Sequence, residues 1–421
     1  MVDSRWQTEL EIPTEGFFDA FASQLAQPDG LRDGLREAVK VLIPRIDWEA
    51  YLPHVPQGIL GLRAVLRLRP LLTEGAFRRA LAIQLHMAAH EGRRASATTA
   101  QAVAAKGSGT WRNLESFIQS RKPGLAYAEA QGFDLPDAAD FRRLGALVEG
   151  DMANVGHKGV FTAHLADLHE RLERPKATGR RLFGLAAWLA ATQEDTFWYR
   201  RAAKRMEREA TDAPAAGNDA AVREICDLGL VGMLDAFTGR IKAGASHGQL
   251  LSILVEAASE KLLDARRDLE GKTAWTLVYL AHLAETPPSD PCVWAQGAAL
   301  VNLFPTDEPE ERVQPKGGVP DGSALLEAIL DAEAPEAMGH AQALCRAGKA
   351  DEALARVAEA ATFNDPTFNH ASQILAAAAT ADLLPHLPSA SAEAMLVALA
   401  KSFANSQGSG DLGRLADRAL G

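Results

Sequence analysis

Apolar residues recur at intervals of three and four positions along nearly the whole chain. Phe17, Phe21 and Leu25 follow this spacing, and residues 77–85 repeat it. Strong helix formers such as Ala, Leu, Arg and Glu are common, whereas alternation of apolar and polar residues over six positions is scarce. The sequence therefore predicts an all-α protein, a multi-helix array of roughly 15 to 20 helices at ordinary helix and loop lengths.

Two stretches interrupt this pattern. Residues 210–221 are small and polar and contain Pro214 and Gly217, which is typical of a loop or linker. Residues 305–322 hold four prolines and three glycines among charged residues, so they cannot form a regular helix. These breaks predict three helical regions, of which the first two are expected to share one core: N-terminal 1–210, middle 223–304 and C-terminal 323–421.

The C-terminal region contains one phrase that resembles a tetratricopeptide-like hairpin. Residues 341–354 place a small-residue helix before a glycine turn, which is followed by Asp-Glu-Ala-Leu. Only one clear copy is present, and a solenoid needs at least three repeats to stack. We therefore expect a C-terminal helix-turn-helix (TPR-like) segment and not a repeat domain.

Charge and composition exclude several classes of protein. The chain of 421 residues carries 44 Lys and Arg against 55 Asp and Glu, a net charge of −11. An acidic surface repels phosphates, so neither nucleic acid nor an anionic membrane is expected as a partner. About 18 uninterrupted apolar residues, the length of a membrane span, occur nowhere, and residues 1–15 lack the apolar core of a signal peptide. The expected compartment is the cytoplasm.

Common chemical motifs are missing. Three cysteines, Cys226, Cys292 and Cys345, form no Cys-x-x-Cys pair, which argues against a zinc knuckle, a redox dithiol or a disulfide-stapled domain. The chain also lacks a glycine-rich dinucleotide loop, a phosphate-binding loop and a nucleophile elbow. Nucleotide-dependent and serine-hydrolase functions are therefore disfavoured.

Histidine placement is the most informative chemical feature. Four of the 11 histidines stand where an apolar helix is expected to begin: His54, His157, His247 and His370. The positive end of a helix dipole disfavours imidazolium, and neutral imidazole is the form that binds a metal. Convergence of these helix starts would suit iron, zinc or copper. Each histidine alone could instead cap backbone N–H groups or fill a turn.

His157 lies on a predicted buried stripe. His157, Phe161, His164 and Leu168 recur at i, i+4, i+7 and i+11, which is one face of a helix. Imidazoles on an apolar face need polar partners or a ligand. Phe161 and His164 are therefore candidate substrate-binding residues beside a metal at His157.

The neighbours of His157 yield further expectations. Asp151 and Asn154 are the nearest candidate polar partners. Lys158 is expected to face elsewhere, because one residue turns a helix by about 100°. His169 lies off the buried stripe and is expected in solvent.

Two further groups of side chains allow two interpretations each. His86 and His90 at i, i+4 are spaced to chelate a metal, but they also stand at a helix end that favours protonated histidine. Trp275, Tyr279 and His282 fall at i, i+4 and i+7. They belong either to the core or to a cavity where the two rings stack an aromatic ligand and His282 provides a catalytic polar contact.

The chain resembles the questin oxidase-like family. The resemblance rests on His54 followed by the apolar segment 58–62, on Gly156-His157-Lys158 and on His370. That family comprises all-helical proteins that include anthraquinone-processing oxygenases, in which histidines, and in some cases a modified lysine, surround a non-haem iron. The resemblance implies iron as cofactor, with His54, His157 and His370 as ligands.

The chain departs from the family pattern in two places. Gln373 stands where the family lysine is expected, and an amide cannot be carboxylated. Residues 271–275 lack the expected histidine, for which His282 is a substitute. Gly-His-Lys also looks like a set of helical proteins linked to Rieske domains. Rieske cysteines are missing here, so an iron–sulfur partner would be a separate electron-transfer protein.

Two functions follow as expectations. The first is a metal-dependent oxidoreductase or oxygenase acting on an aromatic or polyketide-like small molecule. In this function the metal is iron or another transition metal. It is bound by His54, His157, His370 and His247, and His282 assists. The second is a non-catalytic helical scaffold or protein-binding module with a degenerate metal site.

Overall fold

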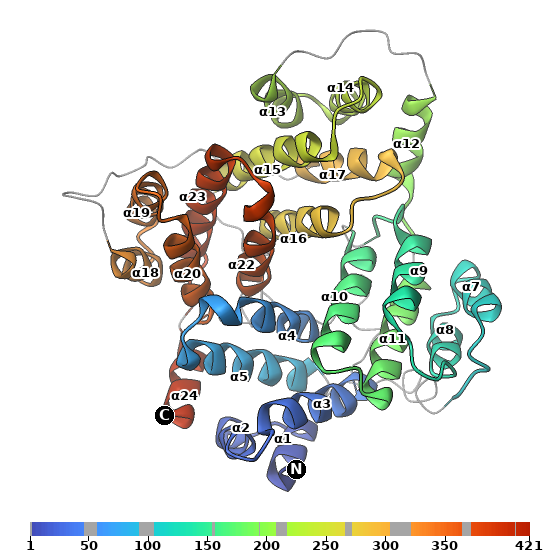
Figure 1. The fold of residues 1–421 in the computed structure, drawn as a ribbon, viewed down its shortest axis with the longest axis vertical. Coiled ribbons are helices and arrows are strands. Elements are labelled where there is room, and N and C mark those ends of the chain that lie inside the picture. Colours follow the sequence, from blue (N-terminus) through green and yellow to red (C-terminus); the bar gives the residue numbers. More distant parts are fainter. Residues whose placement is uncertain are drawn as a thin grey trace. The chain divides into compact units, whose positions relative to one another are not determined.

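The computed structural model describes most of the chain. The described residues are 2–45, 57–91, 105–153, 156–192, 194–207, 217–265, 272–303, 321–363, 372–408 and 410–421. Within these ranges the chain forms 22 α-helices and three short 3-10 helices, and no β-strand (Figure 1). The all-α prediction is confirmed.

Contacts between Cα atoms divide the chain into two compact units. Unit 1 comprises Met1–Leu66, Arg78–Asp195 and Leu412–Gly421, and unit 2 comprises Arg67–Phe77 and Thr196–Asp411. The chain therefore leaves unit 1 twice, within α4 and after Asp195, and returns to it twice.

Unit 1 contains the helices before Thr196 and the last helix of the chain. Its elements are α1 (Ser4–Glu11), α2 (Phe17–Leu25), α3 (Gly30–Leu42), η1 (Ile43–Arg45), α4 (Gln57–Leu68), α5 (Glu74–Glu91), α7 (Trp111–Gln119), α8 (Pro123–Ala130), α9 (Ala138–Val148), α10 (His157–Arg171), α11 (Lys176–Ala190) and α24 (Asp411–Leu420). Three of these helices, α4, α5 and α24, cross the boundary with unit 2. Arg79 on α5 forms an ion pair at 2.9 Å with Asp417 on α24.

Unit 2 contains the remaining helices. They are η2 (Arg69–Leu71), α12 (Phe197–Met206), α13 (Asn218–Asp227), α14 (Leu230–Lys242), α15 (His247–Asp264), α16 (Lys272–Glu285), α17 (Pro291–Leu303), α18 (Gly322–Leu330), α19 (Ala334–Arg346), α20 (Ala350–Ala361), α22 (Ser372–Leu383), η4 (Leu384–His386) and α23 (Ser389–Asn405). α15 packs against α23, and α16 packs against α22.

Helices of the predicted middle region, 223–304, pack against helices of the C-terminal region, 323–421. They also pack against α12 of the predicted N-terminal region, which contacts α14 and α17. The division into three regions stays a prediction. α16 and α22 are both apolar around most of their surface, so each is buried only by pairing with the other and with further helices.

The predicted helix-turn-helix in the C-terminal region is present as α19 and α20. Gly348 ends α19 in the left-handed conformation at φ +74°, which a glycine adopts without a steric penalty. Lys349 N donates to Leu344 O at 2.9 Å and closes the turn. α18 packs against both helices (Figure 1). The likeness of this segment to a tetratricopeptide hairpin stays a prediction.

α10 is the central helix for the candidate site. It lies beside α9 and α11 (Figure 1) and packs against both. Gly156 precedes it at φ +80°, so the chain can turn sharply into the helix at His157. The predicted stripe is confirmed, since His157, Phe161, His164 and Leu168 are all buried.

The prediction that His169 lies in solvent is wrong. His169 is 1% exposed, and its Nε2 donates to the carbonyl oxygen of Pro136 at 3.2 Å. The ring fits between α10 and α11 because residue 179 is a glycine: a Cβ built there would lie 2.3 Å from His169 Cε1. A polar residue next to a close helix crossing is buried by its partner helix, which the α10 sequence alone cannot reveal.

Among the described residues, no helix combines the length and the apolarity that a bilayer span requires.

Gly179→Ala should destabilise the protein by about 1–3 kcal/mol, because the new methyl group must displace a ring that Pro136 and the core hold in place. Gly145→Ala on α9 is the matched control: its Cβ meets only Thr162 Cγ2 at 3.9 Å. That change should leave stability unchanged or raise it by about 0.5–1 kcal/mol through helix propensity. Urea unfolding measures both, and equal effects of the two changes would contradict the packing described.

Candidate functional site

His157 is the first residue of α10 and is 6% exposed. Its Nε2 lies 3.3 Å from Nε2 of Gln57, the first residue of α4. With the amide nitrogen as the donor, the imidazole Nε2 is the acceptor of this contact. The positive end of the α10 dipole disfavours a charged ring at this position.

Glu91, the last residue of α5, lies on the same helix start. Its carboxyl oxygens accept from Gln57 N at 3.0 Å and from Gly58 N at 3.1 Å. Burial raises the pKa of Glu91 to about 8, and the two backbone N–H donors oppose that rise. Sequence analysis did not single out Glu91. We refer to Gln57, Glu91 and His157 as the three-helix junction, since each stands at the end of a different helix.

A glycine makes the junction possible. A Cβ at Gly58 would lie 2.6 Å from the backbone nitrogen of Ala88, so α4 begins directly against the backbone of α5. The Oε1 atom of Gln57 is buried and accepts no hydrogen bond from any described residue. The junction thus offers one imidazole nitrogen, one carboxyl group and one amide oxygen.

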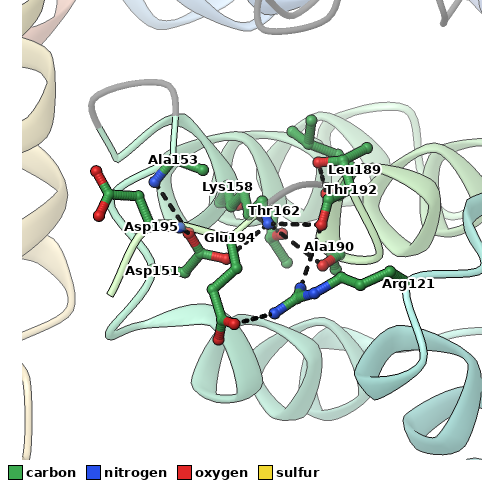
Figure 2. A network of polar contacts seen from close by, with 10 residues as sticks. All are labelled: Arg121, Asp151, Ala153, Lys158, Thr162, Leu189, Ala190, Thr192, Glu194 and Asp195. Carbon is green, nitrogen blue, oxygen red and sulfur yellow. Dashed lines mark hydrogen bonds and ion pairs between the residues drawn. The ribbon is translucent and has the colours of Figure 1, made fainter. Parts of the chain in front are cut away.

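A buried ion pair adjoins the junction. Lys158 Nζ lies 2.6 Å from Asp151 Oδ2, and the lysine side chain is fully buried (Figure 2). Nζ also lies 3.5 Å from the carbonyl oxygens of Ala190 and Thr192 at the end of α11. Burial lowers the pKa of Lys158, while Asp151 opposes the shift. The ammonium group therefore caps the last carbonyls of α11.

Asp151 also joins the segment before α10 to the segment after α11. Asp151 Oδ1 accepts from Ala153 N and from Asp195 N, each at 2.9 Å. Arg121 donates to Thr192 O at 3.2 Å and pairs with Glu194 at 2.6 Å (Figure 2). Two cations at a helix C-terminus are favourable because the dipole is negative there.

Lys158 is buried and contacts Asp151 and the end of α11, whereas His157 contacts Gln57, so the two side chains face different partners as expected. The prediction that Asp151 is a polar partner of His157 is wrong. Asp151 is committed to Lys158 and to two backbone N–H groups, and Gln57 is the polar neighbour of His157 that the structure shows. Gln57 is 100 residues away in sequence, so no local pattern could indicate it. Asn154 lies outside the described residues.

The candidate residues of unit 2 lie on different helices. His247 is exposed at the start of α15, and its ring centroid lies 5.5 Å from that of Trp294 on α17. On α16, Trp275 and Tyr279 are 5% and 3% exposed, and His282 is half-buried with its ring 6.5 Å from Tyr279. The α16 stripe therefore faces the core, with His282 at its edge.

The predicted metal ligands are only partly within the described residues. His54 and His370 lie outside them. In the described part of the chain, no three His, Cys, Asp or Glu side chains are grouped as metal ligands. Gln373, at the position of the family lysine, is buried on α22, and its Nε2 donates to Ser406 O at 3.0 Å.

No protein-family model, curated protein or solved structure matches this chain. The resemblance to the questin oxidase-like family therefore stays a prediction. A proposal for the function must therefore rest on the side chains of the three-helix junction and of the α16 stripe.

Lys158→Met should lower the free energy of unfolding by about 3–5 kcal/mol, because Asp151 would stay buried without its cation. Lys158→Met/Asp151→Asn should lose less than the single variant, since asparagine keeps the Oδ1 acceptor and carries no charge. Lys40→Met breaks an exposed pair with Glu37 and should change stability by no more than about 0.5 kcal/mol. A double variant less stable than Lys158→Met would refute the ion-pair explanation.

His169 should make stability depend on pH. Burial lowers its pKa, against a weaker opposing effect of the Pro136 carbonyl, so the folded state binds its proton more weakly than the unfolded state. Stability is complete above the unfolded pKa of about 6.5 and falls below it, by at most about 1.4 kcal/mol per pH unit, until the folded pKa is reached. The difference in unfolding free energy between wild type and His169→Asn should therefore shrink from pH 7.5 to pH 5.5.

Proposed function

We propose that the protein is a metal-dependent oxidoreductase acting on an aromatic or polyketide-like small molecule, with iron as cofactor and His157 as a ligand. The observation that carries the proposal is the position of His157, a buried imidazole at the first residue of α10 that contacts the first residue of α4. His54 precedes that residue by only three positions in the chain. Imidazole and oxygen donors together suit non-haem iron.

The junction residues fit such a centre in their chemistry. His157 Nε2 would bind the metal after the Gln57 amide turns away, and Gln57 Oε1 and the buried Glu91 carboxyl supply oxygen atoms nearby. Burial raises the pKa of Glu91 to about 8, so the carboxyl would have to release its proton to act as a ligand. The bound iron would supply the redox chemistry with dioxygen. His370 and His247 stay predictions from the sequence alone.

Substrate contacts are assigned to the aromatic residues. Trp275 and Tyr279 would stack an aromatic ring, with His282 as a polar catalytic contact at the edge of the stripe. Phe161 and His164 would line the apolar side of α10 next to His157. We also propose a cytoplasmic protein that receives electrons from a separate electron-transfer protein.

A second candidate is a non-catalytic helical scaffold with a degenerate metal site. The α18, α19 and α20 helices favour it, because short helices that pack side by side with three-residue turns expose grooves that suit peptides. Gln373 in place of a lysine also favours it.

Metal analysis of untagged protein, before and after iron reconstitution, tests the proposal. His157→Ala should lose the metal, and it should lower the melting temperature mainly in the metal-loaded protein, because a ligand stabilises the folded state that binds it. His169→Ala, a buried histidine on the same helix, should lower the melting temperature equally with and without metal. Less than a tenth of an equivalent of any transition metal in reconstituted wild type would reject the enzyme and favour the scaffold.

A further inference from the structure

We propose that His86 and His90 form a second, independent site that chelates one divalent transition metal, such as Zn²⁺, Ni²⁺ or Cu²⁺. Both residues lie near the end of α5, one helical turn apart. The proposal does not depend on the function proposed for His157.

The geometry of the pair matches chelation. The two Nε2 atoms lie 3.0 Å apart, and the ring centroids are 4.3 Å apart at an angle of 67°. Two metal–nitrogen bonds of about 2.1 Å at about 90° place their nitrogens about 3.0 Å apart. A small rotation of each ring therefore replaces the hydrogen bond between the nitrogens with a shared metal ion.

One of the two rings is already held in place. His86 stacks on Phe18 with centroids 5.3 Å apart and meets the edge of Phe17 at 5.1 Å. Both phenylalanines are buried on α2. Because these contacts fix the ring before a metal arrives, less side-chain entropy is lost on binding than for two exposed histidines.

The second ring provides access. His90 is exposed, and His86 is half-buried, so a hydrated ion can reach both nitrogens and keep water at its remaining coordination positions. Affinity for such a two-imidazole site should follow the usual order, with Cu²⁺ above Ni²⁺ and Zn²⁺.

Metal binding at this pair would affect the three-helix junction, because one of its residues is adjacent in sequence to His90. His90 directly precedes Glu91, whose carboxyl group caps α4. A metal that links His86 to His90 fixes the last turn of α5 and so stabilises the position of Glu91.

Calorimetric titration of untagged protein with ZnCl₂ tests the site. Wild type should bind Zn²⁺ at this pair, and His90→Ala should weaken that binding at least tenfold. His386→Ala removes another exposed histidine and should leave it unchanged. His157→Ala should also leave it unchanged, which separates this site from the one proposed for iron.

Spectroscopy of the Cu²⁺ complex provides the second measurement. Hyperfine structure from two nitrogens is expected for wild type and from at most one for His90→Ala. The rise in melting temperature with Zn²⁺ should be smaller in His90→Ala than in wild type, and His90→Ala/His157→Ala should show none. Zn²⁺ binding by His90→Ala with wild-type affinity, or a spectrum without two nitrogens, would overturn the proposal.

Discussion

The ion pair between Lys158 and Asp151 is the interaction on which the geometry of the candidate site depends. A buried pair costs desolvation energy, and it persists only where further hydrogen bonds complete it. Here the carbonyl oxygens of Ala190 and Thr192 accept from the Lys158 ammonium group. The N–H groups of Ala153 and Asp195 donate to the Asp151 carboxylate. One charged contact thus fixes the start of α10, the end of α11 and the loops beside them.

The ion pair between Lys158 and Asp151 also fixes the position of His157. Lys158 fixes the first turn of α10 through Asp151 and the end of α11, and His157, the residue before it, contacts α4. Gln57 contacts His157 from the start of α4, and Glu91 caps that start from the end of α5. A residue next to a buried ion pair on a helix is more rigid than a residue on a loop. A metal ligand or catalytic group requires this rigidity.

The sequence predicts the local part of this arrangement well. Apolar spacing located the helices, and the stripe from His157 to Leu168 was correctly predicted to be buried. Burial of Lys158 and His169 could not be predicted, because it depends on the end of α11 and on Gly179, which no helical period encodes. Gly58 and Gly179 are the signals that were available: a glycine inside a helix often marks a close approach.

The order of the chain has a consequence for how unit 1 is made. Its last helix, α24, is joined to α5 by the ion pair between Arg79 and Asp417, yet more than two hundred residues of unit 2 separate α24 from the rest of unit 1. A nascent chain therefore cannot complete this core until α24 has left the ribosome. Unit 2, by contrast, has nearly all of its residues in one continuous run and can fold during synthesis while unit 1 waits for its final element.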